Sequence, residues 1–162
     1  MDAFVAWLQT TWLSQAIVSH LWVWPVAEIL HFVGLALVIG IVGFFDLRLL
    51  GFFRTVSVSA AHDLVPVAVG GFALNLVTGV VFLIGHPEQY AHNIAWWYKV
   101  ACLAVAGLNA AIFERAAGAT TMRLGAGDDT SAAAKAIGIV SILAWFGVLF
   151  WGRMLPFIGN AY

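Results

Sequence analysis

Long runs of apolar residues, each about as long as a bilayer is thick, dominate the hydropathy pattern of this chain. A helix that spans a membrane needs about 20 predominantly apolar residues. Four segments meet this requirement: residues 24–45, 64–85, 94–113 and 134–152. Pro25 and Pro66 fall in the first turns of their predicted helices and Pro87 follows the end of one, which are positions that proline tolerates. The pattern therefore predicts four transmembrane helices.

The N-terminal segment, residues 3–18, has a different pattern. Its large apolar side chains lie at positions 4, 5, 8, 12 and 13, with Gln9, Thr10 and Thr11 between them. This spacing indicates an amphipathic helix. The segment is too short and too interrupted to span a bilayer, so we expect it to lie flat at the membrane interface.

The composition excludes an ordinary water-soluble domain. The chain is 63% hydrophobic and 9% charged, whereas a soluble domain averages about 45–50% apolar and about 25% charged residues. We interpret residues 1–162 as one all-α transmembrane domain, an antiparallel four-helix bundle with an N-terminal interfacial helix. Its expected partner is the lipid bilayer. The net charge of −1 gives no reason to expect nucleic acid, and formation of a homo-oligomer stays open.

The basic residues predict the orientation of the bundle. Five of them lie in the loops between spans one and two or between spans three and four: Arg48, Arg54, Arg115, Arg123 and Lys135. Only Lys99 and Arg153 lie toward the other face. Because positive loops stay in the cytoplasm, both termini are expected in the periplasm of a bacterium, with the chain in the inner (cytoplasmic) membrane. Residues 1–19 lack the basic start and continuous apolar core of a cleavable signal peptide.

Two further expectations concern the cytoplasmic side. Residues 118–131, which contain Gly, Thr, Ala and Asp, have the composition of a flexible linker. Asp46 and Arg48 are expected to form an ion pair near the cytoplasmic interface.

The best candidate chemistry lies on the first span, where Glu28 and His31 are three residues apart and therefore project from one helix face. Ionisable groups inside a bilayer are costly and usually functional. His31 follows Trp24 by seven residues, or roughly 10 Å at about 1.5 Å per residue. Lys99, at the start of the third span, can reach the same depth. Gly79 on the second span would leave room beside them for something flat and bulky.

These residues predict a site between helices one, two and three in the outer half of the bundle. Thr78 offers a nearby hydroxyl, and Trp96 and Trp97 would cover the pocket. Less specific readings stay open. His31 can form a structural hydrogen bond with Glu28, and Lys99 can extend its amine to the lipid headgroups. The remaining histidines are ordinary interfacial residues in this reading: His20, His62, His86 and His92.

Several strings of residues resemble a bacterial family of four-helix membrane proteins without an assigned activity. They are Pro25-x-x-Glu28-x-x-His31-x-x-Gly34, Asp46-Leu-Arg48-Leu-Leu-Gly51, Thr78-Gly79, Tyr98-Lys99 and Ala106-Gly-Leu-Asn109. More distantly, His31 and Lys99 resemble the histidine and lysine associated with haem b in HemJ-type protoporphyrinogen oxidases. Lys99 and Asn109 are similar to residues of CopD-type copper-resistance proteins.

The hypothesis that follows is a membrane-embedded b-type haem protein acting in electron transfer or haem-dependent redox chemistry. His31 would be an axial ligand with Lys99 or His86 opposite it, and Glu28 would orient the imidazole or carry protons. Arg153 would pair with a propionate. Quinones or periplasmic redox carriers are the expected partners.

Two alternatives stay open, and the sequence does not decide whether the chain is an enzyme. One is a protein that binds or helps transport copper or another divalent metal, with His31, Glu28 and the outer histidines as ligands. The other is a non-enzymatic membrane scaffold subunit.

Overall fold

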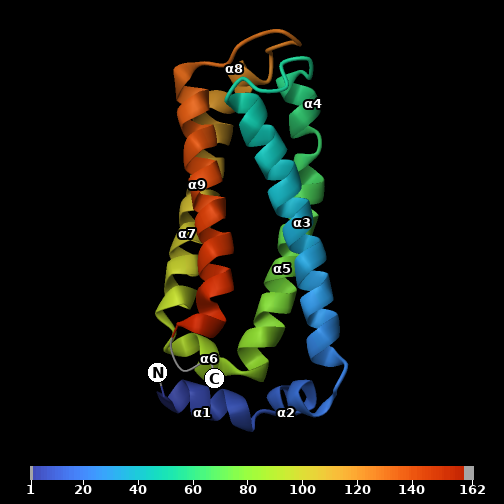
Figure 1. Cartoon of the computed structure of the whole chain (residues 1–162), viewed down its shortest axis with the longest axis vertical. Coiled ribbons are helices and arrows are strands. Elements are labelled where there is room, and N and C mark those ends of the chain that lie inside the picture. Colours follow the sequence, from blue (N-terminus) through green and yellow to red (C-terminus); the bar gives the residue numbers. More distant parts are fainter. Residues whose placement is uncertain (1, 159–162) are drawn as a thin grey trace.

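The structure is a computed structural model that describes residues 2–158, and it confirms the all-α prediction (Figure 1). Four helices are long and apolar enough to cross a membrane. They are α3 (Val23–Leu49), α5 (Val65–Gly85), α7 (Ile94–Ile112) and α9 (Ala132–Met154). Their bounds agree with the four predicted spans to within a few residues, so the chain is a multi-pass membrane protein by this criterion.

Local sequence signals explain where these helices begin. The Asn93 side chain accepts a hydrogen bond from the N–H of Ala95 at the start of α7, and the Ser131 side chain does the same for Ala134 at the start of α9. Such caps satisfy amide groups that have no partner within the helix. Pro66 lies in the first turn of α5, where its missing N–H costs no hydrogen bond.

The long helices form two hairpins, α3 with α5 and α7 with α9. Figure 1 shows the hairpins meeting near α8 at one end of the bundle, and the lower part of α5 turning away from α3 toward α6 at the other end. We call the first the α8 end, because α8 (Ala119–Thr121) lies there, and the second the α1 end, after α1 (Asp2–Thr10).

Small residues bring the helices within each hairpin close together. A Cβ atom placed on Gly34 of α3 would lie 2.6 Å from the carbonyl oxygen of Gly71 on α5. In the other hairpin, a Cβ atom on Gly147 would lie 2.6 Å from the sulfur of Cys102. Close backbone approach through small residues is typical of membrane helices.

The α1 end is covered by short helices that lie across the bundle axis (Figure 1). The predicted single helix over residues 3–18 is instead two helices, α1 and α2 (Trp12–Ser19). The chain breaks at Thr11, whose side chain accepts from the N–H of Ser14 and caps α2. Helix α6 (Pro87–Ala91) joins this layer through a 2.7 Å hydrogen bond from Gln9 to Glu88.

At the α8 end, α4 (Val58–His62) and a π-helical turn (Phe113–Gly118) pack around an apolar core. Arg48 is fully buried beside this core. Its guanidinium donates to the carbonyl oxygens of Val56, Gly125 and Asp128, and Thr130 donates to that of Leu49. These bonds hold the loop before α9 in place, so the expectation of a flexible linker is wrong here.

The expected ion pair between Asp46 and Arg48 is also wrong. No ion pair joins them among residues 2–158. Two residues apart on a helix, they point in different directions. Arg48 faces backbone carbonyl groups. Asp46 lies where α3 contacts α9, and its backbone carbonyl oxygen is 3.2 Å from a Cβ atom built on Gly138.

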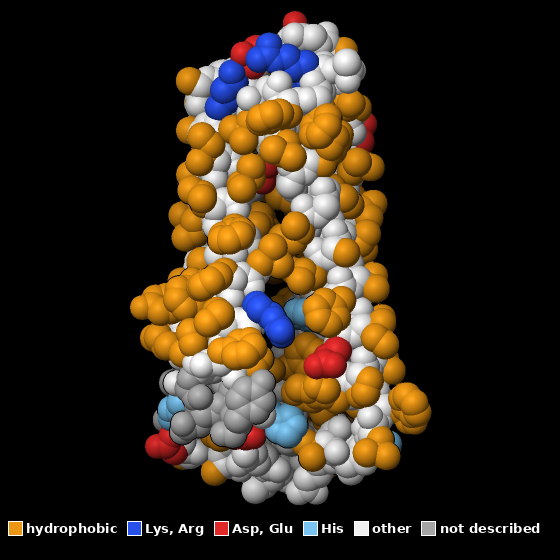
Figure 2. All heavy atoms as spheres, viewed as in Figure 1, with side chains coloured by type: hydrophobic (Ala, Val, Ile, Leu, Met, Phe, Trp, Pro, Cys, Tyr) orange, Lys and Arg blue, Asp and Glu red, His pale blue; other side chains and the backbone are white. Residues whose placement is uncertain are grey.

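The exterior of the bundle is apolar along its length, as expected for a surface in contact with lipid (Figure 2). Phe32, Leu143 and Phe146 expose between 65% and 68% of their surface. Charged side chains gather at the α8 end and around the hollow between the hairpins. A final 3₁₀ turn, η2 (Leu155–Phe157), follows α9 at the α1 end.

Candidate functional site

A cavity of about 760 Å³ lies between the two hairpins, toward the α1 end. All four long helices and α6 contribute to its walls. The volume falls within the range of small-molecule and cofactor sites, about 300–1,000 Å³. Figure 2 shows the hollow on the lateral face of the bundle, with basic, acidic and histidine side chains at its opening. The lining includes five of the six predicted site residues: Glu28, His31, Gly79, Lys99 and Arg153.

His31 lies on the α3 wall, and a hydrogen bond fixes its ring. Its Nδ1 lies 2.7 Å from the hydroxyl oxygen of Thr78 on α5. That hydroxyl has a single proton, and it donates this proton to the carbonyl oxygen of Leu74, 2.8 Å away. Both contacts are satisfied together only when Nδ1 carries the proton and donates to Thr78. The neutral imidazole then presents an unprotonated Nε2, the form that ligates a metal ion.

The backbone around His31 is held from α5 as well. With the Asn75 amide oriented so that both of its ends are satisfied, its nitrogen donates to the carbonyl oxygen of His31 over 2.6 Å. Its oxygen accepts from the N–H of Leu35 over 3.0 Å. The His31 ring also packs against the ring of Phe82, with 5.4 Å between their centres. His31 is therefore fixed by three residues of one neighbouring helix.

Glu28 lines the same cavity but does not orient His31. Its carboxylate accepts a 3.1 Å hydrogen bond from the indole nitrogen of Trp24, one turn earlier on α3. Within the described residues, no hydrogen bond joins Glu28 to His31. Thr78 fills the orienting role that the sequence offered to Glu28.

Lys99 extends along the wall of the cavity. A Cβ atom placed on Gly152 of α9 would lie 3.7–3.9 Å from Cδ, Cε and Nζ of Lys99. The lysine side chain thus lies across a glycine of the neighbouring helix and borders the cavity. Arg153, the next residue after Gly152, borders the cavity as well, and its guanidinium lies 5.4 Å from the centre of the Phe157 ring.

Gly79 has the open surroundings that the sequence suggested. A Cβ atom built on it meets no atom within 4 Å among the described residues. Of the two tryptophans expected to cover the pocket, Trp96 lines it. Trp97 does not: its indole nitrogen donates to the carbonyl oxygen of Ala91, and it is 45% exposed.

His86, the alternative second ligand, does not line this cavity. It lies at the junction of α5 and α6, with its Nδ1 3.4 Å from Glu88. Its ring meets that of Trp24 edge to face, with 4.9 Å between the centres. It borders instead a separate groove of about 430 Å³ beneath α1 and α2. Helix geometry alone could not show that His86 and His31 face different spaces.

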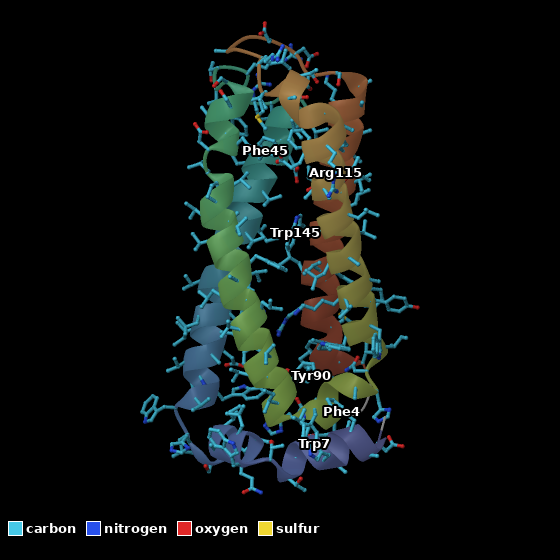
Figure 3. The ribbon with its side chains drawn as sticks, turned by 180° about the vertical axis from the view of Figure 1, so that it is seen from behind. Phe4, Trp7, Phe45, Tyr90, Arg115 and Trp145 are labelled. Carbon is cyan, nitrogen blue, oxygen red and sulfur yellow. The ribbon has the colours of Figure 1, made fainter. Side chains whose placement is uncertain are left out.

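Sequence reasoning missed the contribution of α6 and, apart from Arg153, that of α9. Trp145 of α9 meets Phe72 of α5 edge to face, with 6.4 Å between their centres, and this pair bridges the hairpins at the inner end of the cavity. Tyr90 of α6 lies at the other end, and Figure 3 shows both labelled residues in the space between the hairpins. Burial and the nearby Glu28 and Glu88 carboxylates raise the pKa of Tyr90 to about 12, so its phenol stays protonated at neutral pH.

Across the part of the chain that the structure describes, no group of three or more His, Cys, Asp or Glu side chains could hold a metal ion. Comparisons with protein-family models, curated proteins and solved structures found no match for this chain. The geometry of the cavity is therefore the basis for inferring a function.

Proposed function

We propose that the chain is a membrane-embedded b-type haem protein, with His31 as an axial ligand of the iron. The observation that carries this proposal is the hydrogen bond between His31 and Thr78, which leaves Nε2 as the unprotonated ring nitrogen when Nδ1 is the donor. An imidazole whose other nitrogen donates to a fixed acceptor is the usual arrangement of a histidine ligand.

The shape and lining of the cavity support a flat macrocycle. Gly79 leaves open space on the α5 wall, and aromatic side chains such as Trp24, Phe82 and Trp96 border the cavity. A haem would supply one-electron chemistry, whose potential depends on the axial ligands and on burial. The protein's part is to orient the imidazole, to exclude water with apolar walls and to keep Tyr90 available as a neutral hydrogen-bond donor.

The proposal includes the membrane setting. The basic α8 end would lie in the cytoplasm and the α1 end in the periplasm of a bacterium. The cavity, nearer the α1 end, would then exchange electrons with quinones in the outer leaflet or with periplasmic carriers.

The test is the absorption spectrum of protein purified without added cofactor, together with haem content per chain. The wild type should show the Soret band of a haem protein, and His31→Ala should lose it. The matched control is His62→Ala, because His62 lies at the α8 end, where its ring pairs with Glu114 at 2.9 Å. His31→Gly should regain haem when imidazole is added. A colourless wild type, or equal haem content in His31→Ala and wild type, would refute the proposal.

A further inference from the structure

The charges that line the cavity do not balance. Four lining side chains besides Tyr90 can carry charge: Glu28, His31, Lys99 and Arg153. Glu28 lies on α3, and His31 is neutral when it donates to Thr78. Lys99 and Arg153 both lie on the wall that α7 and α9 form. When both basic side chains are protonated, the cavity contains two cations and one anion.

Both basic side chains border the cavity from the same wall. The Lys99 amine would lie 3.9 Å from a Cβ atom on Gly152, and Arg153 is the next residue of α9. Neither Lys99 nor Arg153 forms an ion pair with a carboxylate in residues 2–158. Arg153 instead stacks over the Phe157 ring, and the Glu28 carboxylate accepts from Trp24.

A cation held inside a membrane protein without a counter-charge is energetically costly. Side chains long enough to reach the headgroups normally do so. The Lys99 stem lies across Gly152 and borders the cavity, so a molecule bound there can contact its amine. The arrangement becomes favourable when the cavity binds a molecule that brings its own negative charge to this wall.

We propose that the cavity binds an amphipathic carboxylate, with Lys99 and Arg153 holding its acidic groups and the apolar walls holding its body. Lys99 is then an anion-binding residue and not a second iron ligand. The inference takes from the proposed function only that this cavity holds the ligand, and it does not depend on iron or on ligation by His31.

The remaining walls fit such a body. The inner end is apolar, closed by Trp145 and Phe72, and Gly79 leaves one face unfilled. The hollow opens on the lateral face of the bundle (Figure 2), whereas α1, α2 and α6 cover the axial end. A ligand that partitions into lipid can therefore enter sideways and leave its acidic groups at Lys99 and Arg153.

The experiment uses metal-free protoporphyrin IX, which has two carboxylates, and its dimethyl ester, which has none. Both are titrated by fluorescence into the full-length protein in phosphatidylcholine nanodiscs. The wild type should bind the diacid at least about tenfold more tightly than the ester, since charge-assisted hydrogen bonds are about twice as strong as neutral ones. Lys99→Met should weaken binding of the diacid by about 10- to 100-fold and leave that of the ester unchanged.

Two further variants keep the test decisive. Lys99→Arg retains the charge and should retain the preference for the diacid. Lys135→Met removes a cation at the α8 end, where it pairs with Asp129 over 2.8 Å, and should match the wild type. Equal affinity of the wild type for diacid and ester, no binding of the diacid, or equal weakening of both ligands in Lys99→Met would overturn the inference.

Two additional outcomes separate related explanations. If wild-type protein binds the metal-free diacid selectively but takes up no haem, the haem proposal fails and this inference stands. If replacing phosphatidylcholine with phosphatidylglycerol abolishes the preference for the diacid, the cations bind lipid phosphate groups, and the inference is overturned.

Discussion

The hydroxyl of Thr78 lies near Nδ1 of His31 and near two carbonyl oxygens of its own helix, those of Leu74 and Asn75. When its single proton goes to one of these carbonyl oxygens, the hydroxyl oxygen accepts from Nδ1 of His31. Removing this oxygen frees the ring to rotate and lets either nitrogen carry the proton. Thr78 therefore influences which ring nitrogen His31 presents to the cavity.

Thr78→Val tests this control, because valine keeps the shape and removes the hydroxyl. We expect haem affinity to fall by about 10- to 100-fold, the usual effect of losing a partner of a ligating histidine, with a shift of the Soret band. Haem content and the absorption spectrum measure both effects. Thr121→Val is the matched control. Thr121 is 4% exposed and Thr78 is 3% exposed, so both are buried, but Thr121 lies at the α8 end, away from the cavity. Equal spectra and haem content for Thr78→Val and wild type would show that the bond has no such role.

For single residues, the sequence predicted which side chains line the cavity better than it predicted their hydrogen-bond partners. Helical spacing correctly placed Glu28 and His31 on the wall of one cavity. It could not show that Glu28 would bond to Trp24, because a carboxylate can accept from donors three or four residues away on either side. The partner of His31 comes from another helix, and the pairing of helices is a property of the tertiary fold.

At the scale of elements, Arg48 connects parts of the chain that are far apart in sequence. Its guanidinium reaches the turn after α3 at Val56 and the loop before α9 at Gly125 and Asp128. Arg48 is itself fully buried, and its guanidinium provides hydrogen-bond donors for these carbonyl oxygens. Together with the apolar core beside it, Arg48 therefore holds the α8 end, where the two hairpins meet.

Arg48→Met should destabilise the protein by about 3–5 kcal/mol, because it removes the three hydrogen bonds made by a fully buried guanidinium, and a hydrogen bond to a charged group contributes about 1.5–3 kcal/mol. The loop between α8 and α9 should also become sensitive to protease. Thermal unfolding in detergent and limited proteolysis measure the two effects. Arg54→Met is the control: its ion pair with Asp129 is exposed, with 47% and 43% of the two side chains accessible, and such pairs contribute about 0–1 kcal/mol. Similar unfolding temperatures for the two variants would contradict this role of Arg48.

The sequence predicted the long elements well and the short ones poorly. Hydropathy marks a span by about 20 consecutive residues, so four spans were identifiable to within a few residues. Helix α4 has five residues and the π-helical turn has six, too few to give a periodic signal. The composition of residues 118–131 suggested flexibility, because nothing local reveals that Arg48, some 70–80 residues earlier in the chain, is bonded to this loop.

For the whole molecule, the main feature is that the two hairpins touch at the α8 end and enclose a cavity nearer the α1 end. The contact between α3 and α9 through Gly138 contributes to holding the α8 end together, and the Trp145–Phe72 pair marks where the cavity begins. The sequence placed the site between three helices. Apart from Arg153, the fourth wall, on α9, could not be predicted, because its residues Val148, Leu149 and Gly152 look like those of any apolar span.

The orientation of the chain in the membrane determines which compartment lies nearer the cavity, and this orientation can be measured directly. Exposed Ala3 lies on α1 and exposed Ala126 lies in the loop at the α8 end. Single cysteines at these positions, in a Cys102→Ala background, are labelled with a membrane-impermeant maleimide in intact spheroplasts and in inverted vesicles. Since the five basic residues of the two inner loops favour a cytoplasmic α8 end, Ala3→Cys should react in spheroplasts and Ala126→Cys in inverted vesicles. The reverse result would place the cavity nearer the cytoplasm, and its electron partner would then be sought on that side of the membrane.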